Sequence, residues 1–327
     1  MKKKVMVTGA SGLIGSHLIE KLLNLGYIVY GLDVVELKTN NNLKEIKRNQ
    51  NFKYFKGDVR SLHDINSFFQ TDASVLYHLA SVVGVNKYME DPMSLIDIGI
   101  LGTRNLIDKC YKHNVRMLFT STSEVYGKNP KIPWSEDDDR VLGPTNIDRW
   151  CYSTSKALCE HMLFGMYHKY KWPMSIIRFF NAYGPKQNPI YVVSKSIHNV
   201  LNNVSPELYD GGDQTRCFTY VEDVIDGIIL AATLDSAIGH VINLGNNVEN
   251  TIKEVLNTVL KVTNSEIEIK NINTNKRYGD VYEDIPRRVP NINKAYKLLG
   301  WEPKIKMPEG IEKTVTWVKK NPWYLKQ

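Results

Sequence analysis

Tyr152 and Lys156 are the residues of this chain whose types and spacing point most directly to chemistry. Four positions apart on a helix, the two side chains would lie on one face, one turn from each other. An ammonium group beside a phenol favours the phenolate, so we expect Lys156 to lower the tyrosine pKa from about 10 towards neutrality. The pair therefore predicts proton transfer from a substrate hydroxyl group.

The first residues of the chain predict the cofactor that such a proton transfer needs. A glycine-rich segment, Thr8–Gly15, follows an apolar run and opens an amphipathic segment, Leu13–Leu25. Glycines at such a turn let the backbone approach a pyrophosphate, and the helix after them directs its positive end at it. We therefore expect a nicotinamide dinucleotide, which would accept a hydride while Tyr152 accepts the proton. The expected contacts in this loop are Gly9, Ser11, Gly12, Leu13, Ile14 and Gly15.

Two acidic residues at the ends of later apolar runs refine this expectation. Asp33 ends the second run, where a carboxylate can accept hydrogen bonds from both adenosine ribose hydroxyls and repel a 2′-phosphate, which favours NAD over NADP. Asp58 follows the third run, where it can hold the adenine amino group. Val59, Leu79 and Ala80, together with Tyr152 and Lys156, complete the predicted cofactor contacts, whereas we expect a structural role for the neighbouring His78.

The elements that must position these residues alternate between strand-like and helical patterns. This alternation predicts an α/β fold, a doubly wound parallel (Rossmann) sheet with a smaller, discontinuous α+β substrate-binding domain. We assign residues 1–180, joined by about 215–247, to the cofactor domain and 181–327 mainly to the second. We expect His240–Leu244 to return to the sheet. The other predicted strands are Val5–Thr8, Ile28–Asp33, Phe52–Lys56, Val75–Leu79, Met117–Ser121 and Ser175–Arg178; the predicted helices are Leu13–Leu25, Leu62–Phe69, Leu95–His113 and Ser153–Tyr170.

Composition narrows the class of protein. The 327 residues are 43% hydrophobic and 24% charged, as in ordinary globular proteins of one or two domains. The net charge of +7 is mostly dispersed, so we expect a small anionic substrate and no nucleic-acid partner. No run approaches the roughly 20 apolar residues that cross a bilayer, so we expect no membrane association. The four cysteines lack metal-ligand spacing, which predicts no metal site and a reducing cytoplasm.

These motifs together resemble the extended short-chain dehydrogenases/reductases that modify nucleotide-linked sugars. The likeness runs nearly end to end, from Thr8–Gly15 through residues 122–127 and 178–185 to residues 288–301. The resemblance implies a catalytic triad of Thr122, Tyr152 and Lys156. It implies that Asn181 contacts the substrate diphosphate and that Arg216 holds the nucleotide. It also implies a homodimer formed through the helices predicted at Leu95–His113 and Ser153–Tyr170.

Within that family, the residues after Thr122 bear on the reaction. Thr122-Ser123-Glu124 resembles UDP-glucuronate decarboxylases and also GDP-mannose 4,6-dehydratases. Arg149, three residues before Tyr152, and Arg288 match the decarboxylase branch, where the equivalent of Arg288 has a catalytic role; in other relatives it binds the diphosphate. We keep both roles open for Arg288.

The expected substrate contacts are Arg149, Asn181, Tyr209, Arg216 and Arg288. The loop after Pro185 lacks the arginine expected to recognise a hexuronate carboxylate, and it offers Lys186 and Lys195 instead.

Oxidation at C4 of a glucuronosyl group makes a β-keto acid, which loses its C5 carboxylate readily. Ser123 and Glu124 would orient the substrate and act near C5, giving UDP-xylose or a UDP-4-keto-pentose. The leading hypothesis is therefore an NAD-dependent UDP-glucuronate decarboxylase. The alternatives are a nucleotide-sugar 4,6-dehydratase or 4-epimerase and, from a different class, a non-catalytic NAD-binding scaffold.

Overall fold

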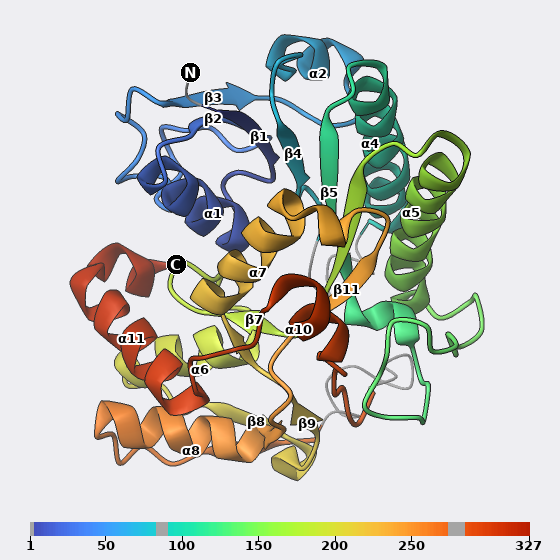
Figure 1. The fold of residues 1–327 in the computed structure, drawn as a ribbon. Coiled ribbons are helices and arrows are strands. Elements are labelled where there is room, and N and C mark those ends of the chain that lie inside the picture. Colours follow the sequence, from blue (N-terminus) through green and yellow to red (C-terminus); the bar gives the residue numbers. More distant parts are fainter. Residues whose placement is uncertain (1–2, 83–90, 274–284) are drawn as a thin grey trace.

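A seven-stranded, wholly parallel sheet forms the centre of the computed structural model, which describes residues 3–82, 91–273 and 285–327 (Figure 1). The strand order is β11-β6-β5-β4-β1-β2-β3. This is the doubly wound order with one strand added at the β6 edge. The strands are β1 (Lys4–Thr8), β2 (Ile28–Asp33), β3 (Phe52–Lys56), β4 (Val75–His78), β5 (Arg116–Thr122), β6 (Met174–Phe179) and β11 (Val241–Leu244).

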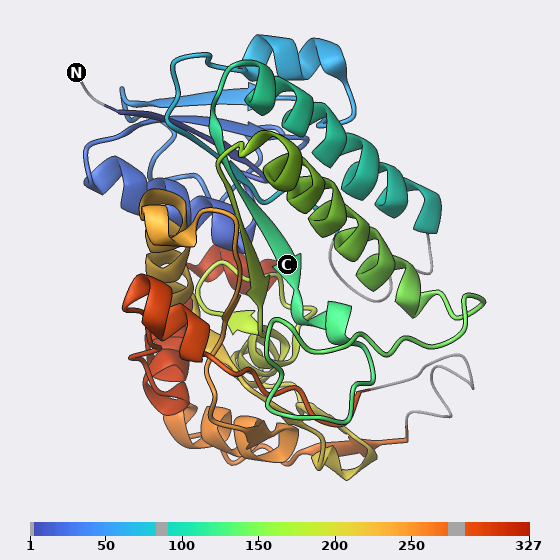
Figure 2. The ribbon, with the colours of Figure 1, turned by 45° about the vertical axis from the view of Figure 1, so that its right-hand side comes forward.

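Helices cover both faces of this sheet, as the views in Figures 1 and 2 agree. Alternate side chains along β1 separate into two cores: Val5 and Val7 pack towards one face and Met6 towards the other. Burial on both faces explains why the strands are nearly continuous apolar runs. One core lies under α1 (Leu13–Asn24) and α7 (Val221–Thr233); the other lies under α2 (Leu62–Phe68), α4 (Pro92–Lys112) and α5 (Arg149–Tyr170).

A second group of elements lies below the carboxyl ends of the strands in Figure 1. Three two-stranded sheets join it: β10 with β7, β12 with β9, and β13 with β8. Helix α8 packs against α6 and α11, whereas α10 packs against β11 and α7 of the sheet region. The bounds are β7 (Ala182–Tyr183), α6 (Val192–Leu201), β8 (Glu207–Tyr209), β9 (Thr215–Arg216), β10 (Thr219–Tyr220), β12 (Asn250–Thr251), α8 (Ile252–Thr263), β13 (Lys270–Ile272), α10 (Asn293–Leu299) and α11 (Met307–Lys320), with short 3-10 helices η1 (Ser123–Tyr126), η2 (Asp210–Gly212), η3 (Asp235–Ala237) and η5 (Pro322–Lys326).

The predicted fold class is confirmed, and each predicted strand is present to within one residue at either end. The predicted return of the chain at His240–Leu244 is confirmed as well, because β11 pairs with β6. Helix α5 begins at Arg149, four residues earlier than predicted, so Tyr152 and Lys156 both lie inside it. Helix α4 begins at Pro92, where the Asp91 side chain accepts a hydrogen bond from the Ser94 amide and caps its first turn. The division of the chain into two domains stays a prediction.

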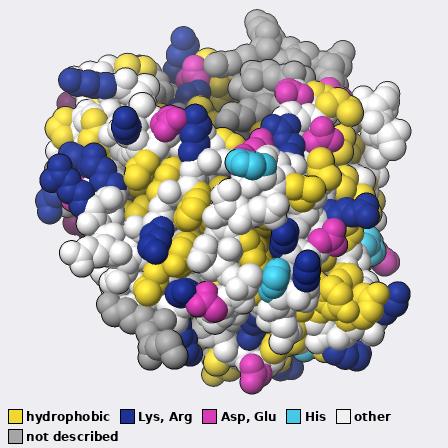
Figure 3. Space-filling model, turned by 90° about the horizontal axis from the view of Figure 1, so that it is seen from above, with side chains coloured by type: hydrophobic (Ala, Val, Ile, Leu, Met, Phe, Trp, Pro, Cys, Tyr) yellow, Lys and Arg dark blue, Asp and Glu magenta, His cyan; other side chains and the backbone are white. Residues whose placement is uncertain are grey.

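The surface agrees with the dispersed charge seen in the sequence. In the face drawn in Figure 3, basic and acidic side chains are interspersed with hydrophobic ones. Among the described helices, none is both long and apolar enough to cross a membrane.

Candidate active site

The glycine-rich loop follows β1 and lies beside the end of β4. These two strands are neighbours in the sheet, and the direction of the strand order reverses between them. Gly9 has a φ of +70°, and a Cβ there would lie 2.8 Å from the Ala80 amide nitrogen. A Cβ on Gly15 would collide with the Gly9 carbonyl. The Ala80 amide donates to Thr8 Oγ1 at 3.2 Å, which ties the two strand ends together. Only glycine fits these two positions, and the crevice beside them is where this fold binds ligands.

The start of α1 and the end of β2 offer the groups that a dinucleotide requires. Gly12 is the N-cap of α1, and no side chain in the described part of the protein caps that first turn. Its positive end can therefore accept an anion such as a pyrophosphate. The Asp33 carboxylate lies directly beside this loop, because its Oδ2 accepts a hydrogen bond from the Ser11 amide at 2.9 Å. The predicted pyrophosphate and ribose contacts are thus adjacent, and both suit a dinucleotide.

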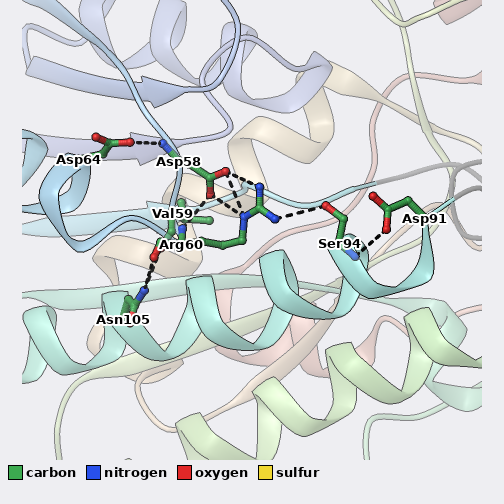
Figure 4. Close-up of polar contacts among 7 residues, drawn as sticks. All are labelled: Asp58, Val59, Arg60, Asp64, Asp91, Ser94 and Asn105. Atoms are coloured by element: carbon green, nitrogen blue, oxygen red, sulfur yellow. Dashed lines mark hydrogen bonds and ion pairs between the residues drawn. The ribbon is translucent and has the colours of Figure 1, made fainter.

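Asp58 is held by a neighbour that the sequence analysis missed, Arg60 (Figure 4). Arg60 Nη2 lies 2.7 Å from Asp58 Oδ2, and the Arg60 amide donates to Oδ1 at 2.8 Å. These hydrogen bonds and the guanidinium charge hold the pKa of Asp58 below its ordinary value. Arg60 Nη1 also donates to Ser94 Oγ on α4 at 3.4 Å, and Asn105 donates to the Val59 carbonyl. Asp58 is therefore an oriented carboxylate; its contact with adenine stays a prediction.

His78 has a structural environment, as expected. Its Nδ1 lies 2.8 Å from Thr8 Oγ1, and its Nε2 lies 3.0 Å from Thr103 Oγ1. Burial, together with the charge of Lys156, lowers the pKa of His78 to about 3. A neutral imidazole with both nitrogens engaged links the glycine loop to α4.

Tyr152 lies in α5 with its phenol among hydroxyl groups and a carboxylate. Side-chain hydrogen bonds join it to Ser81 and Thr122, and both hold its pKa down. Burial raises the pKa more strongly, and the negative charge of Glu124 adds to that effect, so the pKa lies above its ordinary value. Thr122 Oγ1 also accepts a hydrogen bond from the Glu124 amide at 3.2 Å. The structure therefore brings Thr122, Glu124 and Tyr152 together, as the sequence predicted.

Lys156 projects from the same helix face towards β5. Its Nζ donates to the Thr120 carbonyl at 2.8 Å, and burial lowers its pKa to about 8. The prediction that Lys156 brings the Tyr152 pKa towards neutrality is thus wrong for the protein without a ligand. Desolvation opposes the charged form of both groups and is the largest influence on each pKa.

Glu124 meets Arg288 although 164 positions separate them in the chain. Arg288 Nη1 lies 3.3 Å from Glu124 Oε1, and the two side chains are 9% and 13% exposed. Glu124 Oε2 and Arg288 Nε are both buried without a hydrogen-bond partner among the described residues. Buried polar atoms of this kind are rare in folded proteins and point to a ligand that satisfies them.

The other predicted substrate contacts come from four segments. Asn181 has a φ of +37°, and its buried Nδ2 has no partner within the described residues. Arg216, in β9, donates to the Pro286 carbonyl, two residues before Arg288. Arg149 opens α5 and lies over the Trp150 ring. Tyr209, in β8, donates from its hydroxyl to Glu207.

Lys186 and Lys195 were the two lysines expected to bind a substrate carboxylate, and both are already engaged in ion pairs. Lys186 is buried and forms an ion pair with Glu20 of α1 at 2.5 Å. Lys195 forms an ion pair with Glu207 at 2.6 Å. Each ammonium already has a carboxylate of the protein. Arg288 also contacts a carboxylate, that of Glu124, but its buried Nε has no partner among the described residues, so Arg288 is the better candidate.

The sequence analysis also missed Ser81, Asn42 and the pair Glu160–Arg178. Asn42 Nδ2 donates to the Ser11 carbonyl at 2.9 Å and lies 3.3 Å from the Lys186 carbonyl, which ties the glycine loop to the loop after Gly184. A signal existed for Glu160, since it continues the four-residue spacing of Tyr152 and Lys156. For Ser81 and Asn42 we find no such signal.

Comparison with known proteins identifies relatives over almost the whole chain. The family model described as GDP-mannose 4,6 dehydratase matches residues 6–314. A UDP-N-acetyl-alpha-D-glucosaminuronate decarboxylase of Bacillus cytotoxicus is 36% identical over 97% of this chain and 98% of its own length. UDP-glucuronic acid decarboxylase 1 of Xenopus tropicalis is 30% identical over 98% of this chain and 73% of its own.

Among solved structures, the UDP-glucuronic acid 4-epimerase of Bacillus cereus, in complex with UDP-glucuronic acid and NAD, superimposes with a TM-score of 0.85. It is 28% identical and covers 97% of this chain and 99% of its own. The relatives thus carry out three different reactions by their names, and a nucleotide-linked sugar is common to them.

Proposed function

The chain belongs to the extended short-chain dehydrogenase/reductase family of nucleotide-sugar epimerases, dehydratases and decarboxylases, and we propose that it is an NAD-dependent decarboxylase of UDP-glucuronate. The observation that carries this proposal is the buried Glu124–Arg288 pair beside Tyr152. The Arg288 guanidinium, with an unmet Nε donor, suits a sugar that carries its own carboxylate at C5, and the unmet Glu124 oxygen suits a hydroxyl group of the same sugar. Two relatives whose names specify decarboxylation support the same assignment.

The cofactor expected here is NAD, which supplies the hydride acceptor for C4 when bound. The glycine loop, the open N-terminus of α1 and Asp33 form a site that fits a dinucleotide. The carboxylate of Asp33 disfavours a 2′-phosphate, so NAD fits better than NADP.

Each side chain of the site has its own role in the reaction. Tyr152 gives up its own proton as cofactor and substrate bind, and the resulting phenolate takes the proton of the C4 hydroxyl while hydride leaves C4, which gives a 4-keto sugar. The C5–carboxylate bond then breaks as CO2 departs, and its electron pair moves into the C4 carbonyl to form an enolate. Hydrogen bonds from Tyr152 and Thr122 stabilise that oxygen. A proton added at C5 completes the 4-keto-pentose, and hydride return gives UDP-xylose. Glu124 lies near C5, and Arg288 either offsets the substrate charge or supplies the C5 proton.

A homodimer belongs to the same proposal. Helices α4 and α5 lie side by side on the outer face of the sheet in Figures 1 and 2. Their exposed apolar side chains include Leu101, Tyr111, Leu158 and Tyr170. Two copies of this helix pair would form a four-helix contact that covers them.

Light scattering tests this dimer. We expect a dimer for the wild-type protein and a monomer for Leu158→Glu; a monomeric wild-type protein would contradict the proposed dimer.

Incubation with NAD and a panel of sugars tests the reaction. The panel contains UDP-glucuronate, UDP-N-acetylglucosaminuronate, UDP-glucose and GDP-mannose, with products read by mass spectrometry. Release of CO2 from UDP-glucuronate supports the proposal. Release of CO2 from the N-acetylated sugar alone would move the assignment to that substrate. Release of water from a hexose would establish a dehydratase, and inversion at C4 without a mass change an epimerase. Turnover of none of them would leave a non-catalytic role.

A further inference from the structure

A buried ion pair lies one helical turn beyond Lys156 and takes no part in the chemistry above. Glu160 of α5 faces Arg178 of β6, with Oε1 3.0 Å from Nε and Oε2 2.7 Å from Nη2. The side chains are 6% and 7% exposed. Two-pronged geometry of this kind fixes the orientation of both partners.

The same pair contacts the segments that carry Thr122, Glu124 and Tyr152. Ser121 Oγ, next to Thr122 in β5, donates to Glu160 Oε1 at 2.5 Å. The Arg178 guanidinium lies 4.8 Å from the centre of the Tyr126 ring, in the 3-10 helix η1 that contains Ser123 and Glu124. Its Nη1 donates to the Glu136 carbonyl at 3.0 Å. The ion pair therefore connects α5, the end of β5 and η1 from beneath the site.

Stability alone does not account for such a pair. Removing two charges from water costs about as much as their attraction returns, so apolar residues of similar size often stabilise a protein equally well. An apolar pair would supply neither the fixed orientation that the hydrogen bonds of this ion pair give nor a charge. Charge matters here because Glu160 acts on Lys156: its negative charge raises the Lys156 pKa against the lowering by burial.

We propose that Glu160 and Arg178 are positioning residues that hold the Tyr152–Lys156 helix in register with the Thr122–Glu124 segment and fix a carboxylate one helical turn from Lys156. Glu160 provides the negative charge, and Arg178 fixes that carboxylate against β5 and η1. The effect on catalysis rests on the proposed function, whereas the effect on Lys156 does not.

The other groups around Lys156 are accounted for. Tyr152 and Cys159 lie on the same helix, and the thiol of Cys159 acts on Lys156 in the same direction as Glu160. From β4, His78 faces Lys156 as a neutral imidazole. From β5, the Thr120 carbonyl accepts its hydrogen bond and the Phe119 ring centre lies 4.7 Å from its Nζ. Glu160 itself is paired with the Arg178 guanidinium.

The first test measures Lys156 in the protein without cofactor or substrate. Lysine is labelled with ¹³C, and the Lys156 signal, identified by its loss in Lys156→Arg, is followed by NMR as the pH changes. In Glu160→Gln we expect the Lys156 pKa to fall from about 8 to about 7. Arg116→Met is the matched control: Arg116 is a buried arginine at the opposite end of β5 that bonds the Ala231 and Leu234 carbonyls. A Lys156 pKa that stays unchanged in Glu160→Gln, or falls equally in Arg116→Met, would overturn the proposal.

The second test separates positioning from folding. The double variant Glu160→Leu/Arg178→Met replaces the pair by apolar side chains, and it serves even where Glu160→Gln alone does not fold. We expect a Tm close to the wild-type value, a kcat at least about tenfold lower, and a KM within about twofold. In Glu160→Gln the alkaline limb of the kcat profile should move to lower pH. A double variant with wild-type Tm and wild-type kcat would reduce the pair to a structural role. Should the wild-type protein turn over no sugar, the proposed function fails while the NMR result still decides the effect on Lys156.

Discussion

The part of the crevice proposed to bind NAD (the cofactor end) and the part proposed to bind the sugar (the sugar end) differ in how many of their polar atoms have hydrogen-bond partners. At the cofactor end, both oxygens of Asp33 accept backbone hydrogen bonds, both nitrogens of His78 face threonine hydroxyls, and Arg60 holds Asp58. At the sugar end, Glu124 Oε2, Arg288 Nε and Asn181 Nδ2 are buried without partners among the described residues.

This difference indicates how each end treats its ligand. At the cofactor end the side chains are already held in place and only the first turn of α1 is left uncapped, so binding there costs little reorganisation. The sugar end leaves unmet hydrogen bonds, and each costs free energy until a polar ligand satisfies it. Polar atoms that gain hydrogen-bond partners only as the sugar reacts stabilise the transition state more than the bound substrate. Substitutions at the two ends should therefore affect different steps.

The largest effect should come from Tyr152→Phe. Removing the hydroxyl removes the acceptor of the C4 proton, so kcat should fall by about a thousandfold or more. NAD affinity, measured by calorimetry, should stay within about threefold because the glycine loop and Asp33 are untouched. A variant that retained most of its turnover would contradict the proposed proton transfer.

Next in size should be the loss of Arg288. Arg288→Gln should lower the rate of CO2 release by about a hundredfold while leaving cofactor binding intact. Its neighbour gives a matched control, since Arg287 is exposed and pairs with Glu249 instead. Arg287→Gln should change the rate less than about threefold. Equal losses in the two variants would show that the sugar end does not depend on the Glu124–Arg288 pair.

A smaller effect should follow from Asp33→Asn. The amide keeps the size of the side chain but removes the charge that accepts ribose hydroxyl hydrogen bonds, so the NAD Kd should rise by about ten- to a hundredfold. Preference over NADP should shrink in the same titrations. An unchanged NAD Kd would remove Asp33 from the cofactor site.

The smallest effect concerns acid stability. His78 is neutral in the folded protein, with its pKa lowered to about 3, whereas the unfolded chain binds a proton near the ordinary pKa of about 6.5. Stability from this residue is therefore complete above pH 6.5 and should be lost by about 1.4 kcal/mol for each pH unit below it, until the folded pKa is reached. Urea unfolding of wild type and His78→Gln at pH 7 and pH 5 measures this. An equal pH dependence in both proteins would rule out His78 as the cause.

The two ends also differ in how much of the site could be predicted from the sequence. The glycine-rich loop, Thr8–Gly15, could be predicted from sequence because local backbone geometry dictates its glycines: φ at Gly9 and the close approach at Gly15 exclude any side chain. The spacing of Tyr152 and Lys156 was likewise enough to place both on one helix face. The role of Lys186 could not be assigned correctly, because nothing in its own segment reveals that Glu20 neutralises it.

The sequence by itself predicted the strands, the glycine-rich loop and the Tyr152–Lys156 spacing, since each pattern is carried by residues that are near one another in the chain; the roles of the loop and the pair stay predictions. Only the tertiary structure decided which charges meet: Glu124 with Arg288, Glu160 with Arg178, and Lys156 with a carbonyl of β5. The physical reason is that the charge state of a buried group depends on its desolvation and on partners brought from distant segments, and neither can be read from local spacing.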